Sequence, residues 1–414
     1  MINNSFSDVV VVGAGAAGVG AARALRARGF SVVVLESRGR AGGRASTVIA
    51  GSGHPIDLGC GWLHSADVNP LTPLARALGF TVDETTPPWR TGAESLGFAP
   101  GDYARYRAAQ ERFYERLEAA AQEETDAPAA SLLEPGERWA PLLNAVSTYV
   151  NGVELDRLSI KDFDNYADTE INFRVAEGYG ALIARLAADL PVAYDTPVRA
   201  IDHAGPRVRV ETDRGAVEAR AAIVTLPTNV IASGAVRFSP AADDALQAAS
   251  RLPLGLADKI YFEVSGAEAL PDNARLFGAV DRACTGAYHY RPFGRPLIEG
   301  YFGGACARAL EAEGPAAFAA FALDELVNAL GSSWRARLTP VAMSAWARDP
   351  HALGSYSHAL PGHWDERAKL ARPVGERLFF AGEATSPHFF STAHGAWESG
   401  ERAAGEAAAF LSAP

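Results

Sequence analysis

Three glycines near the start of the chain follow a short apolar run at the spacing of nucleotide-binding turns. Gly13, Gly15 and Gly18 come directly after 9–12, and a stretch rich in alanine and arginine that reads as a helix continues to Arg28. In a strand–turn–helix unit, the first glycine permits the turn, the second lets a pyrophosphate approach the backbone, and the third lets the helix pack on the sheet. The unpaired N–H groups and the positive end of that helix would hold the phosphates.

A carboxylate and a second glycine turn follow. The apolar stretch 31–35 ends at Glu36, 23 positions after Gly13, where a carboxylate can accept hydrogen bonds from ribose hydroxyls; an NADP site would favour arginine there. The turn Gly42-Gly43-Arg44 can then place an arginine beside the pyrophosphate and let the backbone approach a ribityl chain. A nicotinamide enzyme has no need of this second turn. The motifs together favour FAD over NAD, and over a glycine-rich helix start without a ligand.

The composition is that of a folded globular chain with an excess of negative charge. Its 414 residues are 48% hydrophobic and 21% charged, and 38 basic against 49 acidic residues leave a formal net charge of −11. This charge repels nucleic acids and anionic membranes and attracts small cations. Because Cys60, Cys284 and Cys306 are far apart and lack metal-binding spacing, we expect neither a disulfide framework nor a structural metal. No signal-like or membrane-spanning stretch is evident, so we expect a cytoplasmic protein.

Three separate blocks of sequence predict the parallel sheet that would position the glycine motifs. They are the amino-terminal strand–helix–strand unit, a β-rich block at 192–226, and a strand at 378–381 followed by a loop and a helix from 392 to about 411. We expect an α/β (α+β) fold, in which a Rossmann-like FAD-binding domain is interrupted by a mixed-sheet substrate-binding domain. The expected limits are 1–70, 191–235 and 371–414 for the first domain, and 71–190 and 236–370 for the second.

The two intervening segments contain recognisable elements. Residues 102–124 read as a charged helix with aromatic side chains on one face, and 315–330 read as a second helix. Residues 259–264 read as a strand, and 341–346 as a strand that carries Trp346.

The two glycine motifs at the start of the chain and four further motifs resemble those of the FAD-dependent amine oxidases. This family includes polyamine oxidases, monoamine oxidases and flavin histone demethylases. The further motifs are DLGCGWLHSADVNPL at 57–71, LPLGLADKIYF at 252–262, WARDPHALGSYSHALPG at 346–362 and RLFFAGEATSPHFFSTAHGAWESGERAA at 377–404. The resemblance spans the chain and is strongest for polyamine-oxidase-like bacterial flavin amine oxidases. It implies noncovalent FAD, because Ser355 stands where monoamine oxidases attach their flavin through cysteine.

The resemblance also implies which residues bind the cofactor. They are Gly13, Gly15, Ala16, Ala17, Gly18, Glu36, Ser37, Arg38, Gly42, Gly43, Arg44, Gly59, Cys60, Gly61, Trp62, Val198, Trp346, Tyr356, Gly382, Glu383, Thr392 and Ala393. In the family, the glutamate matched by Glu383 binds the ribityl chain, and the helix start matched by Thr392 faces the flavin pyrimidine. A helix amino terminus stabilises the negative charge of a reduced flavin by about 0.3–2 kcal/mol. Core packing is the alternative for Val198 and Trp346.

Four residues are implied to serve the reaction: Lys259, Tyr356, His64 and Thr392. In the family, a lysine at the position of Lys259 holds a water against flavin N5; an exposed lysine on a strand is the alternative. His64 matches a channel histidine of polyamine oxidases that could bond a substrate nitrogen or relay a proton, and a capping or core histidine is the alternative. Tyr356 would form one wall of an aromatic cage, with Thr392 where monoamine oxidases carry the second aromatic wall.

The sequence thus predicts an oxidase that moves a hydride from the carbon beside an amine nitrogen to flavin N5. The imine would hydrolyse to an aldehyde and an amine, and dioxygen would be reduced to hydrogen peroxide. His64 and the net negative charge favour polyamines. An L-amino-acid oxidase or a desaturase on the same scaffold is the main alternative, although no arginine that would bind a carboxylate can be assigned. A nonenzymatic FAD module and an NAD-dependent dehydrogenase are weaker alternatives, and we expect no nucleic-acid or membrane partner.

Overall fold

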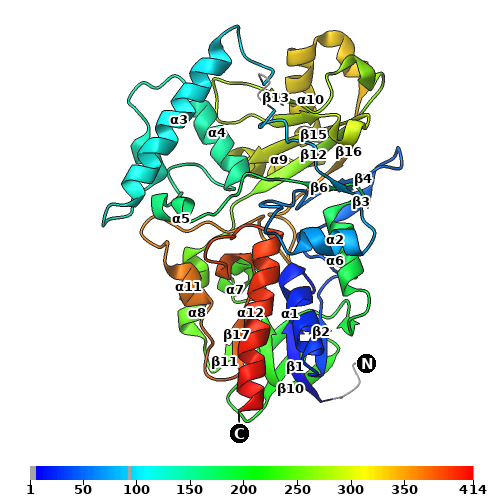
Figure 1. Ribbon diagram of the computed structural model, residues 1–414, viewed down its shortest axis with the longest axis vertical. Coiled ribbons are helices and arrows are strands. Elements are labelled where there is room, and N and C mark those ends of the chain that lie inside the picture. Colours follow the sequence, from blue (N-terminus) through cyan, green and yellow to red (C-terminus); the bar gives the residue numbers. More distant parts are fainter. Residues whose placement is uncertain (1–5, 92–94, 414) are drawn as a thin grey trace.

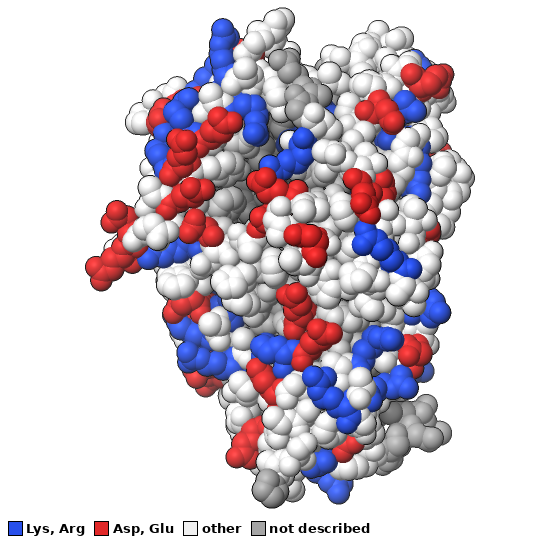
Figure 2. Space-filling model, in the orientation of Figure 1, with Lys and Arg blue, Asp and Glu red and all other residues white. Residues whose placement is uncertain are grey.

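Two β-sheets occupy opposite halves of an elongated molecule (Figure 1). The computed structural model describes residues 6–91 and 95–413. The larger sheet lies in the lower half of the figure and the smaller sheet in the upper half. The face shown in Figure 2 is hollowed in its upper half, and acidic and basic side chains are scattered around it. The predicted mixed α/β fold is confirmed.

The larger sheet joins three blocks of chain that are far apart in the sequence. β10 (Gly215–Val224) pairs in parallel with both β1 (Ser7–Val12) and β17 (Leu378–Phe380), so that Val224 is the register partner of Val12 and of Phe380. The turns that follow these strands therefore meet at one edge, where α/β sheets bind ligands. The remaining strands of this sheet are β2 (Val32–Leu35), β7 (Val192–Ala193), β8 (Val198–Asp202), β9 (Val208–Thr212) and β11 (Arg237–Ser239).

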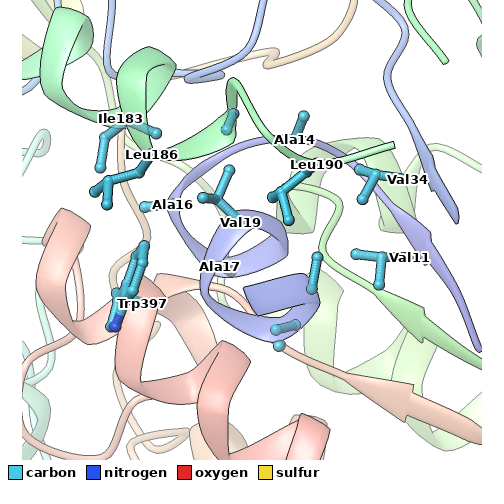
Figure 3. Packing of buried hydrophobic residues seen from close by; sticks show 14 of the residues in the cluster. Val11, Ala14, Ala16, Ala17, Val19, Val34, Ile183, Leu186, Leu190 and Trp397 are labelled. Carbon is cyan, nitrogen blue, oxygen red and sulfur yellow. The ribbon is translucent and has the colours of Figure 1, made fainter. Parts of the chain in front are cut away.

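Helices cover the larger sheet closely. The valines at 9–12 are at most 2% exposed, because β1 is buried on both faces, and this explains its unbroken apolar run. α1 (Ala16–Ala27) and α12 (Ala393–Ser412) pack against each other in front of the sheet (Figures 1 and 3). The indole of Trp397, labelled in Figure 3, lies against Gly20 of α1, where a Cβ atom would be 3.1 Å from the ring. A Cβ atom on Gly400 would lie 2.0 Å from the carbonyl oxygen of Ala17, so the two backbones approach too closely for any side chain there.

The smaller sheet is antiparallel and has two different faces. Its strand order is β13 (Ala274–Phe277), β14 (Ala287–Tyr290), β15 (Leu297–Gly303), β12 (Ala257–Val264) and β16 (Leu338–Met343). Ile260, Phe262 and Phe302 pack in a core with α9 (Gly304–Glu313) and α10 (Pro315–Leu330). Because side chains alternate along a strand, the opposite face presents Lys259, Tyr261, His289, Glu299 and Tyr301.

The elements predicted in the intervening segments are present, with one error. α3 (Asp102–Ala121) buries Tyr106, Phe113 and Leu117 against α4 (Ala140–Val150), and α10 has the predicted limits. The prediction of a strand through Trp346 was wrong: β16 ends at Met343, and Trp346 lies in the turn beyond it. Other elements are α2 (Leu71–Ala77), α5 (Ile160–Asp164), α6 (Tyr179–Ala187), α7 (Thr228–Ala232), α8 (Asp243–Arg251), α11 (Glu366–Leu370), β3 (Thr47–Ile49), β4 (Pro55–Asp57), β5 (Val82–Asp83) and β6 (Arg174–Val175).

Several helices from the ranges expected for the substrate-binding domain pack on the larger sheet instead. α2 and α6 contribute Leu71, Ile183 and other side chains to the core that surrounds α1. α8 and α11 contribute Ala245 and Leu370 to the core on the other face of the larger sheet.

The cysteines differ from the sequence-based expectation. Cys284, between β13 and β14, forms a disulfide with Cys306 in the first turn of α9. The prediction that such a bond is absent was wrong, because the fold closes a sequence separation of 22 residues to a Cα–Cα distance of 5.0 Å. Cys60 is free. In the part of the chain that the structure describes, no helix is both long enough and apolar enough to cross a membrane.

Replacing Gly400 tests the helix contact. Gly400→Ala is expected to destabilise the protein by about 1–3 kcal/mol, because the added methyl group must push α12 away from α1. Gly405→Ala in the same helix is the matched control: nothing lies within 4 Å of a Cβ atom there. We expect this control to be neutral or up to about 1 kcal/mol more stable, since alanine favours helix. Chemical unfolding of both variants measures the difference, and equal stability would contradict the close contact.

Candidate active site

Two glycine turns meet at the edge of the larger sheet. Gly13 has a φ of 104°, which favours glycine, and a Cβ atom on Gly18 would lie 1.9 Å from the Gly13 carbonyl oxygen. Gly15 caps α1 and forms a bridge to Gly42, whose N–H donates to the carbonyl oxygen of Ala14 at 2.8 Å. The nearest atom to a Cβ on Gly15 would be the Gly42 carbonyl oxygen at 3.9 Å, so the backbone there is open to a ligand.

Glu36 holds the first turn in shape. Its Oε2 accepts a hydrogen bond from the Ala14 N–H at 2.8 Å, and its Oε1 accepts from the Arg38 N–H at 2.8 Å and from the Ser37 hydroxyl at 3.1 Å. Arg38 in turn pairs with Asp349 at 2.7 Å. This contact of Glu36 with the turn was not predicted, and its contact with a ribose stays a prediction.

Arg44 and Glu383 form an ion pair between the glycine turn and the loop after β17, in which Glu383 is buried and Arg44 is partly buried. Arg44 Nη1 donates to Glu383 Oε1 at 2.9 Å and to the Ser355 carbonyl oxygen at 2.6 Å, and Ser357 Oγ donates to Glu383 Oε2 at 2.6 Å. Burial alone would raise the pKa of Glu383, but Arg44 and Ser357 hold it below the usual range. A cavity beside the pair is lined by Arg44, Glu383, Gly382, Thr228, Thr385 and neighbouring residues.

α12 begins where the sequence predicted. Thr392 is its cap, with the side-chain oxygen accepting from the Gly395 N–H at 3.0 Å, and Ala393 is its first residue. His394, which was not predicted, lies in the same turn, with its ring 4.7 Å from that of Phe389 and its buried Nε2 without a hydrogen-bond partner among the described residues. Burial and the neighbouring His64 lower the pKa of His394 to about 3, so the ring is neutral at neutral pH.

Lys259 is buried, as its occurrence within an apolar strand suggested. It is 7% exposed, and its Nζ donates to Glu299 Oε1 at 2.9 Å and to the Asp57 carbonyl oxygen at 3.2 Å. The alternative of an exposed lysine on the strand face is therefore wrong. A Cβ atom on Gly61 would lie 3.0 Å from this Nζ, so glycine at 61 leaves room for the ammonium group.

Two residues that sequence reasoning missed complete the surroundings of Lys259. Glu299 is fully buried, and its Oε2 accepts from Arg174 Nη1 at 2.9 Å. Burial would raise the pKa of Glu299, but Arg174 and Lys259 hold it well below the usual range. The sequence did carry a signal for Glu299, which is a lone acidic residue within the apolar run LIEGYF. The sequence around Arg174 carried no such signal.

Other residues of the 57–71 motif contact both the smaller sheet and the turn that carries Arg44. Trp62 Nε1 donates to Tyr301 Oη at 3.4 Å, and the Arg174 guanidinium lies 4.8 Å from the indole ring. A Cβ atom on Gly59 would lie 1.7 Å from the Arg44 carbonyl oxygen and 3.1 Å from Trp346, so these segments are in close contact. Burial raises the pKa of the Cys60 thiol.

His64 is a partly buried, neutral histidine. Its Nδ1 lies 2.6 Å from Asn172 Oδ1, so the proton is assigned to Nδ1 and the lone pair to Nε2. Burial lowers the pKa of His64, and the Asn172 hydrogen bond opposes this only in part. The Tyr356 hydroxyl donates to the carbonyl oxygen of Tyr149. Val198 lies apart from the other predicted residues in sequence but shares a core with Val12 and Leu35 at the ends of β1 and β2.

Trp346 is fixed by an unusual carboxyl group on the other face of β12. The Asp258 Oδ1 accepts from the Ser344 hydroxyl at 2.7 Å and from the Trp346 N–H at 3.2 Å, and the Trp346 indole donates to the Leu58 carbonyl oxygen at 3.1 Å. Burial and the neighbouring Glu311 raise the pKa of Asp258 to about 7. The protonated carboxyl group can donate toward Glu311 while its other oxygen holds Trp346.

Comparison with known proteins gives a consistent result. The model of the family described as flavin containing amine oxidoreductase matches residues 16–408. Polyamine oxidase 4 of Oryza sativa subsp. japonica is 29% identical over 96% of this chain and 88% of its own length, and polyamine oxidase 2 of Arabidopsis thaliana is 29% identical over 96% and 87%. A structure of wild-type putrescine oxidase bound to putrescine has a TM-score of 0.81 at 19% identity, covering 98% of this chain and 99% of that one, and supports the fold.

Asn in place of Asp258 tests the protonated carboxyl group. The pKa of this carboxyl group is 3.8 in the unfolded chain and about 7 in the folded protein. Between these two pH values, the folded protein therefore binds up to one proton more than the unfolded chain. The contribution of this group is therefore complete below about pH 4 and falls by up to about 1.4 kcal/mol per pH unit as the pH rises. Asp258→Asn imitates the neutral acid, so its stability relative to the natural protein should be higher at about pH 8 than at about pH 5. Denaturant unfolding at both pH values measures this, and parallel changes in the two proteins would contradict it.

Proposed function

This chain belongs to the family of flavin containing amine oxidoreductases, and on that premise we propose that it oxidises polyamines at a site between its two sheets. Flavin-dependent amine oxidation with FAD as the cofactor follows from the family. When bound, FAD supplies the hydride acceptor, and we propose dioxygen as the final electron acceptor, with hydrogen peroxide as a product. The larger-sheet part of the chain would hold FAD, and the smaller-sheet part would cover the amine.

The residues at the edge of the larger sheet fit a bound FAD. The open backbone at Gly15 and the amino terminus of α1 suit the pyrophosphate, as does the Arg44 guanidinium. Gly382 also has no atom within 4 Å of a Cβ position, beside the cavity that Arg44 and Glu383 line, where the ribityl chain would lie. The cap of α12 would face the pyrimidine. Ser355 is occupied by hydrogen bonds with the backbone of Ala257, which agrees with noncovalent binding.

The residues around the proposed ring site have distinct tasks. Lys259 would hold a water toward the ring, and Tyr356, with its hydroxyl fixed by Tyr149, would form one wall for the amine. The neutral His64 carries the proposal of a polyamine substrate: with Nδ1 bonded to Asn172, its Nε2 can accept a hydrogen bond from a second substrate nitrogen. The acidic chain and the hollow on the face shown in Figure 2 suit the approach of a polycation.

An amino-acid substrate fits less well. Its carboxylate would need a free arginine near the ring, but Arg174, the arginine nearest to Lys259 among the described contacts, is already paired with Glu299. Arg44 is likewise paired with Glu383.

An anaerobic screen tests the proposed substrate class. Polyamines, monoamines and amino acids are added separately to the FAD-loaded protein, and loss of the visible flavin absorbance is recorded. We expect polyamines to reduce the flavin fastest, and the rate to rise with pH because the reacting nitrogen must be unprotonated. Reduction by amino acids but not by polyamines would contradict the proposal.

Substitution of Lys259 tests its proposed contact with the cofactor. Lys259→Met should retain FAD but lower the rate at which dioxygen reoxidises the reduced flavin by about 10²-fold, because the positive charge and its hydrogen-bond donor are lost. Lys369→Met is the matched control, since Lys369 has a 40% exposed side chain on α11 and pairs with Asp365. Stopped-flow absorbance measures both variants. Unchanged rates in Lys259→Met would show that the assignment is wrong.

A further inference from the structure

We propose that Glu299 is a positioning residue of the active site, which fixes the direction of the Lys259 side chain and supplies the buried carboxylate that opposes its positive charge. The inference rests on the proposed place of Lys259 beside the flavin but not on the identity of the amine.

The two side chains share the buried face of the smaller sheet. Lys259 on β12 is the register partner of Tyr301, and Glu299 lies two residues before Tyr301 on β15, opposite Tyr261. Glu299 Oε1 accepts from Lys259 Nζ at 2.9 Å and from the Tyr261 hydroxyl at 2.6 Å. The exposed fraction of Glu299 is 0%, so water does not compete for these bonds.

An ammonium group has three N–H donors, and the contacts of Lys259 leave one of them available. Among the described residues, the hydrogen-bond acceptors of its Nζ are Glu299 Oε1 and the Asp57 carbonyl oxygen. Together they hold the nitrogen beside Gly61, in the motif expected to contact the flavin. The third N–H can therefore be directed to a water or to the ring only while Glu299 and Asp57 hold the other two.

Glu299 also opposes a second positive charge, because Arg174 pairs with the same carboxylate as Lys259. Arg174 Nη1 lies 2.9 Å from Glu299 Oε2, and its guanidinium is enclosed by the rings of Trp62 and Phe293, each 4.8 Å away. An arginine does not lose its proton in proteins. One carboxylate thus lies between two cations.

The other groups around Lys259 do not replace this carboxylate. The Asp57 side chain accepts the N–H groups of Tyr179 and Gly180. Burial lowers the pKa of His289, 4.0 Å from Glu299, to about 3, so its ring is neutral. The other titratable neighbours are Cys60, His64, Tyr261 and Tyr301, and burial raises the pKa of the thiol and of both phenols and lowers that of His64, so all four are uncharged near neutral pH. Without Glu299, the two cations would be opposed by Asp57, whose pKa burial raises, and both burial and the like charge of Arg174 would favour loss of the lysine proton.

Glu299→Gln in the FAD-loaded protein tests the proposal without any amine. The flavin is reduced with dithionite, and its reoxidation by dioxygen and its midpoint potential are measured across about pH 6 to 9. We expect a new ionisation in the variant, with the reoxidation rate at least about tenfold lower above it than below it. The double variant Glu299→Gln/Lys259→Met should lack this ionisation, which assigns it to the lysine. A pH profile like that of the natural protein, or an ionisation that persists in the double variant, would overturn the proposal.

Glu325→Gln is the matched control. Glu325 is 3% exposed and accepts hydrogen bonds from the Tyr288 and Thr285 hydroxyls at 2.9 Å each, but it lies among residues of the opposite face of the same sheet. The Glu325→Gln variant also loses one buried carboxylate, so we expect an effect on stability. Its pH profile of reoxidation and its midpoint potential should be unchanged. If the pH profile of Glu325→Gln changed in the same way as that of Glu299→Gln, the effect would come from general loosening of the sheet, and the proposal would be overturned.

If Glu299→Gln does not retain FAD, Arg174→Met replaces it. Glu299 then pairs with Lys259 alone, so the lysine should keep its proton and no new ionisation should appear, while the midpoint potential falls because a nearby cation is lost. A lysine-dependent ionisation in this variant would refute the proposal. Because dithionite and dioxygen are the only reactants, failure to find a polyamine substrate would leave these outcomes interpretable.

Discussion

The parallel pairing of β10 with β1 and β17 is the constraint on which the site depends. It brings together strands that begin at Ser7, Gly215 and Leu378, so their following turns share one edge of the sheet. Once that edge is formed, the glycine turns, the Arg44–Glu383 pair and the start of α12 have little freedom in their relative positions. The close contact of α1 with α12 through Gly400 adds a second link between the two ends of the chain.

Buried ion pairs then fix individual side chains at this edge and beneath the smaller sheet. Asp162 on α5 binds Arg367 on α11, Arg367 donates to the Ser357 hydroxyl, and Ser357 donates to Glu383. Such pairs add little net stability, because both charges lose their hydration, but removal of one partner is costly. Their value here is geometric: each carboxylate has one arrangement that satisfies all its donors. The same reasoning applies to Glu299, which has three donors from two strands, β6 and β12.

Local sequence signals predicted the parts of the site that local geometry determines. The glycine turns, the start of α12 at Ala393 and the burial of Lys259 are each determined by a few neighbouring residues, and the structure has them as expected. Glu299 and Arg174 could not be paired in advance, since they are 125 residues apart and meet only after the smaller sheet has formed. The Cys284–Cys306 bond was missed for the same reason. The strand through Trp346 was predicted wrongly because apolar alternation alone does not reveal that Asp258 holds its backbone in a turn.

The net charge of the whole chain is negative, whereas two cations lie next to the proposed ring, and this contrast suits the proposed reaction. The chain as a whole carries −11, which attracts a polycation from solution. Next to the proposed ring, however, two cations, Lys259 and Arg174, share the single carboxylate of Glu299, and His64 and His394 are neutral. These cations would disfavour a protonated nitrogen at the point where a hydride must leave its neighbouring carbon, and would favour a neutral one. Long-range attraction would collect the substrate, and the local positive charge would favour the one protonation state that can react.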